Sequence, residues 1–169
     1  MSDYKLPEDF IMRIEVRGTP GPQGSKRYVG NGRMIESSAK VKPWRQDVKA
    51  EAQRLLANYK LLHGVDWIPL DRPLCVTMVF TLPKPQSAPK RRKTYPDRKP
   101  DLSKLIRSTE DALTDAGLWR DDARVVQYVH TGKVYPGEGG WALSSPGCVI
   151  MLRYMHEDDA KRHPWKGEP

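Results

Sequence analysis

A basic, proline-rich segment between Pro83 and Pro100 is the feature that most restricts how this chain can fold. Its five prolines exclude a regular helix or a paired strand, because proline lacks the amide donor that both structures need. We therefore predict an exposed, extended loop over these residues. A solvated linker explains such a loop about as well as a binding element does, and a nuclear-localisation signal is a weaker interpretation. The loop carries seven cations against one anion, Asp97, and the cations are Lys84, Lys90, Arg91, Arg92, Lys93, Arg98 and Lys99.

Hydropathy patterns on both sides of this loop predict strands and helices. Apolar residues alternate along the expected strands and recur at helical spacing along the expected helices. Pro43 suits a first helical turn, and Gly117 is the expected stop of the second helix. The expected strands cover residues 12–16, 26–29, 33–36, 74–82, 123–132 and 148–154, and the expected helices cover residues 43–59 and 102–116.

The order of these elements predicts the fold class. The order β-β-β-α-β-α-β-β is typical of an α/β (α+β) fold, in which a small mixed β-sheet packs against two main helices. We expect a single domain over residues 1–156, followed by a polar C-terminal tail over residues 157–169.

A glycine-rich segment from Gly18 to Gly32 follows the first expected strand. It lacks the spacing of a phosphate-binding loop, so we expect no nucleotide cofactor. Asn31-Gly32 instead predicts the tight turn of a hairpin, because this dipeptide accepts positive φ angles. Lys26, Arg27 and Arg33 on that hairpin are candidates to contact a DNA backbone, although surface solubility explains them about as well.

Composition restricts the partners and the compartment. The 169 residues carry a net charge of +8, which favours a polyanionic partner. Cys75 and Cys148 are too few for a disulfide framework or a zinc knuckle and predict a reducing, intracellular setting. The N-terminal residues are acidic, and no apolar run approaches the roughly 20 residues of a membrane span. We therefore expect no signal peptide, no membrane contact and a cytoplasmic protein.

Three aspartates flank the second expected helix. Asp101 stands at its start, and taken alone it is an ordinary helix N-cap. Asp121 and Asp122 follow its end, and taken alone they are ordinary turn residues. Asp101 and Asp122 can meet only if the following strand runs back or lies across the start of the helix.

The residues around these aspartates form a series of motifs. In chain order they are Asp101-Leu-Ser103-Lys104-Leu105, Asp111-Ala-Leu-Thr114, Trp119, Asp121-Asp122 and Val125-Val126. This series resembles the RusA-type Holliday junction resolvases, metal-dependent endonucleases of phages and prophages. Their signature has Asp-x-Asp, then Asp-Ala-Leu-Thr, an aromatic residue before Asp-Asp, and Val-Val. A looser similarity to the phage branch extends upstream to residues 22–26 and to Trp44-Arg45.

The resemblance implies an endodeoxyribonuclease that depends on Mg²⁺, with Mn²⁺ as a substitute, and acts in DNA recombination and repair. Its expected partners are branched DNA (a four-way junction) and a second copy of itself, in a bacterial host. The implied metal ligands are Asp101 and Asp122, with Asp121 supporting them and Arg107 binding phosphate. Lys104 and the cations named above, apart from Lys84, are the expected DNA contacts. Because a junction has near two-fold symmetry, paired nicks by a homodimer are expected.

Ser103 is a departure from the family pattern, because it stands where the family has its second aspartate. A hydroxyl is a weaker ligand for Mg²⁺ than a carboxylate. The site then holds one metal, or a second one weakly or through water, or another acid substitutes. Glu36 is our preferred substitute over Asp111 and Glu110, because Glu110 lies about 10 Å from Ser103 along the helix axis. The remaining alternative is a protein that binds junctions without cutting them.

Two other functions compete with a nuclease. A non-catalytic DNA-binding protein would keep the fold and the basic surface, and a basic structural protein that contacts RNA or a virion would have no use for the acidic residues. Trp119 is expected to be a packing anchor for the Asp-Asp turn rather than a platform for base stacking. The four histidines, His63, His130, His156 and His163, show no metal-binding spacing.

Overall fold

A five-stranded mixed sheet forms the centre of the computed structural model, which describes residues 10–24, 26–28, 34–36, 39–89 and 91–161. The strand order is β1-β7-β4-β5, and β6 also pairs with β4. β7 is antiparallel to β1 and β4, whereas β5 and β6 are parallel to β4. The predicted mixed sheet is thus confirmed. Its strands are β1 (Phe10–Arg17), β4 (Leu74–Thr81), β5 (Val125–Tyr128), β6 (Gly132–Val134) and β7 (Gly147–Tyr154).

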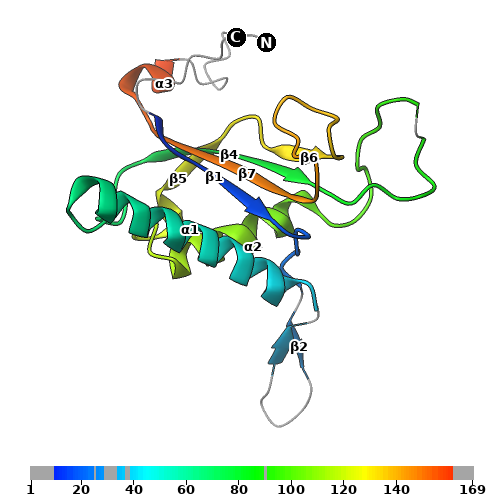
Figure 1. Cartoon of the computed structure of the whole chain (residues 1–169), viewed down its shortest axis with the longest axis horizontal. Coiled ribbons are helices and arrows are strands. Elements are labelled where there is room, and N and C mark those ends of the chain that lie inside the picture. Colours follow the sequence, from blue (N-terminus) through cyan, green and yellow to red (C-terminus); the bar gives the residue numbers. More distant parts are fainter. Residues whose placement is uncertain (1–9, 25, 29–33, 37–38, 90, 162–169) are drawn as a thin grey trace, which may run out of the picture.

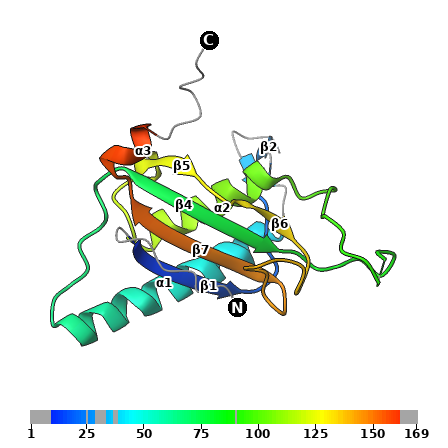
Figure 2. The same ribbon diagram turned by 90° about the horizontal axis from the view of Figure 1, so that it is seen from above.

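Two long helices, α1 (Val41–His63) and α2 (Leu102–Asp115), cover one face of the sheet (Figures 1 and 2). α1 buries a stripe at helical spacing that includes Trp44, Val48 and Ala52. It runs four residues past the end expected at Tyr59 and stops at Gly64, which has a positive φ of 70°. α2 matches the expected helix closely, and Gly117 follows it with a φ of 78°.

The single strand expected over residues 123–132 is confirmed only at Val125–Tyr128, which form β5. Asp122–Arg124 form a 3₁₀ turn, η1, and the chain then makes two short strands along one edge of β4. Between them His130 has a positive φ of 48°, which an extended strand does not allow. At this break the Thr131 hydroxyl accepts a hydrogen bond from the Met78 amide at 3.0 Å. A side chain therefore satisfies a backbone donor that a continuous strand would have bonded.

The hairpin of β2 (Lys26–Tyr28) and β3 (Met34–Glu36) projects away from the sheet near the start of α1 (Figure 1). Its antiparallel pairing confirms the two strands predicted here. The expected Asn31-Gly32 turn and Arg33 lie outside the described residues, as do the side chains of Lys26, Arg27 and Glu36.

The expected polar tail begins with a short helix, α3 (Glu157–Lys161). The guanidinium of Arg153 on β7 donates to both carboxylate oxygens of Asp159, at 2.6 and 3.0 Å. This ion pair ties α3 to the sheet, and residues 162–169 lie outside the described part.

Cys75 on β4 and Cys148 on β7 are buried, free cysteines. None of the helices in the described part is long and apolar enough to cross a membrane.

Candidate active site beside helix α2

The turn after α2 uses its two aspartates differently. Asp121 is extended, with φ −160° and ψ 144°, and its carboxylate accepts a hydrogen bond from the Ala123 amide at 2.8 Å. It therefore caps η1 and braces the turn. Asp122 is the first residue of η1, and its exposed side chain takes no part in this cap. The carboxylate of Asp122 is thus presented to solvent on a fixed backbone.

Asp71 holds this turn from the other side. Its carboxylate accepts hydrogen bonds from Arg120 at 2.9 Å and from Arg124 at 2.7 Å. Arg120 precedes the Asp121-Asp122 pair in the chain, and Arg124 follows it. The hydrogen bond from Arg120 is the main reason why the pKa of Asp71 lies below its ordinary value. This clamp was missed from the sequence, because Asp71 lies far from the turn along the chain and belongs to no motif.

Trp119 lies beneath the turn as the packing anchor that was expected. Its side chain is buried, and its indole N–H donates to the Thr114 hydroxyl at 2.7 Å. A parallel bridge to Leu70 extends this support to the segment that carries Asp71. The indole therefore fixes the turn and is not exposed for base stacking.

Glu110 on α2 is the acidic neighbour of Asp122. The hydroxyl of Tyr128 on β5 donates a hydrogen bond to the Glu110 carboxylate. Burial raises the pKa of Glu110 above its ordinary value, and the charges of Asp122 and Asp111 raise it further, against the opposing effects of Tyr128 and Arg107. The carboxylate of Glu110 thus lies within electrostatic range of Asp122.

Arg107 lies on the same face of α2 as Ser103 and Glu110. These residues stand at positions i, i+4 and i+7, which share one side of a helix. The positive charge of Arg107 acts on Glu110 and lowers its pKa. Arg107 therefore lies between the serine at the start of the helix and the Glu110 carboxylate.

Asp101 occupies the N-cap position of α2 but does not cap it. Its backbone is extended, with φ −67° and ψ 135°, and its side chain makes no cap hydrogen bond. The carboxylate instead lies 3.4 Å from the Lys104 ammonium, and about half of its side chain is exposed. The N-cap interpretation therefore accounts for its position and not for its side chain.

Among the described residues there is no group of three or more His, Cys, Asp or Glu side chains that could hold a metal ion. Asp122 has Glu110 as a neighbour, whereas Asp101 pairs with Lys104. The preferred substitute acid, Glu36, has its side chain outside the described part.

The basic loop is extended and fixed at several points. Residues 83–89 and 91–100 contain no helix or strand, as the prolines predicted. The Lys133 ammonium donates to the carbonyls of Arg98 and Pro100 at 2.9 and 3.0 Å. Glu138 pairs with Lys84 and accepts a hydrogen bond from the Thr94 amide at 3.1 Å. Lys133 and Glu138 were also missed from the sequence.

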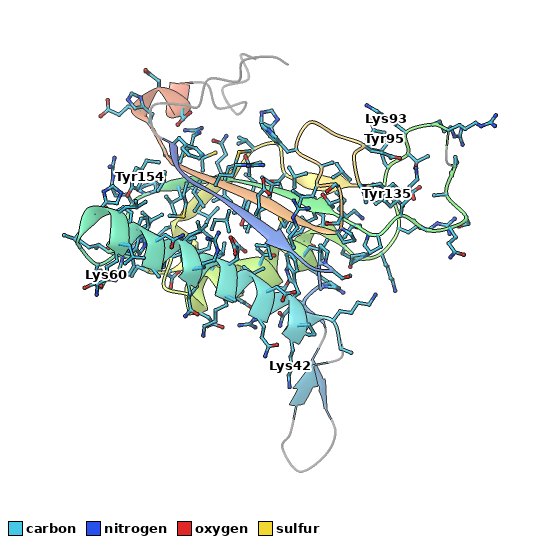
Figure 3. The ribbon with its side chains drawn as sticks, viewed as in Figure 1. Lys42, Lys60, Lys93, Tyr95, Tyr135 and Tyr154 are labelled. Carbon is cyan, nitrogen blue, oxygen red and sulfur yellow. The ribbon has the colours of Figure 1, made fainter. Side chains whose placement is uncertain are left out.

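The cations of this loop are exposed and available to a ligand. Apart from Lys84, none of those in the described part forms an ion pair with another described residue. Lys93 and Tyr95 lie at the same end of the molecule as Tyr135, away from Lys60 and Tyr154 (Figure 3). Lys90 lies outside the described residues; the exposed cations are Arg91, Arg92, Lys93, Arg98 and Lys99.

A family model described as endodeoxyribonuclease RusA matches residues 17–143. The chain belongs to the RusA family. The match spans α1, α2, the basic loop and the Asp121-Asp122 turn, so it includes every element of the site described above. No individual curated protein matches the chain. RusA proteins are endodeoxyribonucleases, which places this chain among the hydrolases that act on DNA.

Proposed function

We propose that this RusA-family protein is a Mg²⁺-dependent endonuclease that resolves four-way DNA junctions by paired nicks during recombination and repair. The proposal is carried by the two carboxylates of Asp122 and Glu110, which interact electrostatically with each other, on a molecule whose basic loop leads directly into α2. Carboxylates alone would repel DNA, and the loop cations offset that repulsion.

The donor set suits Mg²⁺. This ion keeps several waters and binds proteins through one or two carboxylates together with substrate phosphate. Asp122, which is exposed, and Glu110 supply two carboxylates. Burial and, to a smaller extent, the charge of Asp122 raise the pKa of Glu110, and a bound cation would offset both effects. When bound, Mg²⁺ would supply an activated water and neutralise charge on the phosphate.

The other residues of the site position these groups. Arg107 would bind the phosphate of the scissile bond and stabilise the charge that develops there. Tyr128 orients Glu110 through its hydrogen bond, while Asp121 and Asp71 hold the backbone of Asp122.

A homodimer fits the substrate. A four-way junction has near two-fold symmetry, and two copies of one site related by a two-fold axis would nick two opposing strands at equivalent positions. We therefore propose that the active form is a dimer, in the cytoplasm of a bacterial host and of phage or prophage origin.

A cleavage assay on a synthetic four-way junction, labelled on each strand in turn, tests the proposal. We expect symmetric nicks in two opposing strands with Mg²⁺ or Mn²⁺ and none with EDTA, and a dimer in sedimentation velocity. Asp122→Asn should abolish the nicks, whereas Asp66→Asn, which changes an exposed aspartate in the loop after α1, should not.

Two outcomes would overturn this function. Tight, salt-sensitive junction binding without nicks under any divalent ion would favour a DNA-binding protein, which the serine at position 103 also allows. Equal cleavage of linear duplex would leave a nuclease without junction specificity.

A further inference from the structure

A pocket of about 520 Å³ opens beside Asp101, at the start of α2. Its walls come from both ends of the basic loop and from the segment 19–24 that follows β1. The pocket therefore lies where the basic loop, the segment after β1 and the carboxylate of Asp101 meet.

The walls of the pocket combine apolar side chains with cationic ones. Six prolines, with Leu82 and Tyr135, provide apolar surface, while the polar lining has four cations against the single anion Asp101. A free phosphate would not need the apolar walls, and an apolar ligand would not need the cations. A nucleotide has a flat, largely apolar base and an anionic phosphate, and so matches both parts. The four cations are Lys40, Arg98, Lys99 and Lys104.

The size of the pocket selects a single nucleotide. Its volume corresponds to a sphere about 10 Å across, within the range of ordinary small-ligand sites. A DNA duplex does not fit, because its major groove alone is about 12 Å wide. A base must therefore leave the helical stack to enter, and this costs least where pairing is already interrupted. The branch point of a junction is such a place.

The walls are held in place before any ligand binds. The backbone amide of Gln23 donates to the backbone carbonyl of Lys104 at 2.8 Å, and the Ser108 hydroxyl donates to the backbone carbonyl of Gly21 at 2.6 Å. A Cβ atom at Gly21 would lie 2.1 Å from the Lys40 carbonyl oxygen, so only glycine allows this close approach. These contacts fix one wall against both helices, which reduces the entropy lost on binding.

We infer that this pocket binds one nucleotide turned out of the DNA at the branch point, with its base against the prolines and its phosphates at the cationic rim. The inference rests on the proposed function, which supplies the substrate, a four-way DNA junction. The seated nucleotide would place an adjoining phosphodiester beside Asp101. Lys40, at the start of α1, becomes a DNA contact that no sequence motif indicated.

Fluorescence titrations of the full chain with junctions that carry one 2-aminopurine test the pocket. The measurements use EDTA, so that they do not depend on cleavage. The fluorophore brightens when it leaves the base stack, and we expect a several-fold rise at one or two branch-point positions and none within the arms.

Lys40→Ala should weaken junction binding and lower the slope of log K against log salt by about 1, as expected for one lost phosphate contact. Lys40→Arg should restore the slope. The matched control is Lys42→Ala, an exposed lysine on the same helix that does not line the pocket (Figure 3). It should leave the slope unchanged.

An absence of brightening at every branch-point position, or equal effects of Lys40→Ala and Lys42→Ala, would overturn the pocket as a nucleotide site. Brightening and a Lys40-dependent slope without nicks in Mg²⁺ would instead leave the pocket intact and overturn the proposed nuclease. The two failures are therefore distinguishable.

Discussion

The hydroxyl of Tyr128 donates a hydrogen bond to the carboxylate of Glu110, joining β5 to α2 next to Asp122. Burial and the nearby negative charges raise the pKa of the tyrosine as well, so its hydroxyl stays protonated and remains a donor. This contact turns one oxygen of Glu110 toward the strand. It also explains how a glutamate from the middle of the helix comes to accompany an aspartate from the following turn.

Glu110→Gln should lower the junction cleavage rate in Mg²⁺ by about 100-fold, because it removes one of the two neighbouring carboxylates. Tyr128→Phe should lower it by about tenfold, since loss of a residue that orients a metal ligand costs about 10–100-fold in metal affinity or activity. Initial rates over a range of Mg²⁺ concentrations provide the measurement, and added Mg²⁺ should partly rescue Tyr128→Phe. The control is Glu51→Gln, which changes a glutamate of α1 that pairs with Arg54 and belongs to no part of the site. A Glu110→Gln protein that cuts at the normal rate would remove Glu110 from the site.

Asp121 and Asp122 should differ sharply when each is changed to asparagine. Asp121→Asn keeps an oxygen that can accept the Ala123 amide, so we expect less than a tenfold loss of cleavage. Asp122→Asn removes the charge of the metal ligand proposed above, and we expect a loss of at least about 100-fold. Single-turnover rates separate this chemical effect from DNA binding. Similar losses for both variants would mean that the two aspartates do not divide their roles as the turn geometry indicates.

Ser103→Asp restores the acid that the family has at this position. The side chain lies one turn before Arg107 on the same face of α2, so a carboxylate there would add a negative charge to the site without entering the core. We expect junction cleavage to rise or stay unchanged, and the Mg²⁺ concentration at half-maximal rate to fall. Ser103→Asn is the neutral control. A complete loss of activity in Ser103→Asp would mean that the serine is required as it stands.

The sequence predicted the helices and the central strand because their cores repeat at regular spacing. Trp44, Val48 and Ala52 on α1 and the buried run of β4 are examples. The break at His130 could not be predicted, because it depends on the Thr131 hydroxyl meeting a backbone amide of a distant strand.

The site was predicted less completely than the fold, for a related reason. Asp101, Arg107 and Asp122 belong to local motifs, so the resemblance located them. Glu36 was preferred over Glu110 as a substitute for the acid missing at Ser103, because the sequence reveals only the distance between Glu110 and Ser103 along the helix. The approach of Glu110 to Asp122 is set by how the turn after α2 folds back, which no spacing in one element reveals.

The buried hydrogen bond from the Trp44 indole to the Thr109 hydroxyl, 3.0 Å long, joins α1 to α2. Thr109→Val keeps the shape but leaves the indole N–H without a partner, at a cost of about 1–3 kcal/mol in the free energy of unfolding. Trp44→Phe also destabilises the protein, through the cavity it leaves. In urea titrations the double variant should lose less stability than the two single losses combined, by about 1 kcal/mol. Additive losses would mean that this bond contributes nothing of its own.

Glu138 should make the attachment of the basic loop dependent on pH. The hydrogen bond from Lys84 and the Thr94 amide hold the pKa of this carboxyl below its ordinary value. A carboxyl with a lowered pKa in the folded state stabilises the fold above its unfolded pKa of about 4.3, and this contribution is lost as the pH falls through the folded pKa. The Tm of Glu138→Gln should therefore lie below that of the unchanged protein at pH 7, and the two should converge in acid.

Thermal unfolding from pH 7 to pH 3 measures this difference, with Glu157→Gln on α3 as the control that shows none. Limited proteolysis at pH 7 should cut the loop of Glu138→Gln faster, because its link to Lys84 and Thr94 is weakened. Junction binding should weaken in the same variant, since the loop cations lose their fixed position. A Tm difference that stays constant down to pH 3 would show that the carboxylate charge is not what holds the loop.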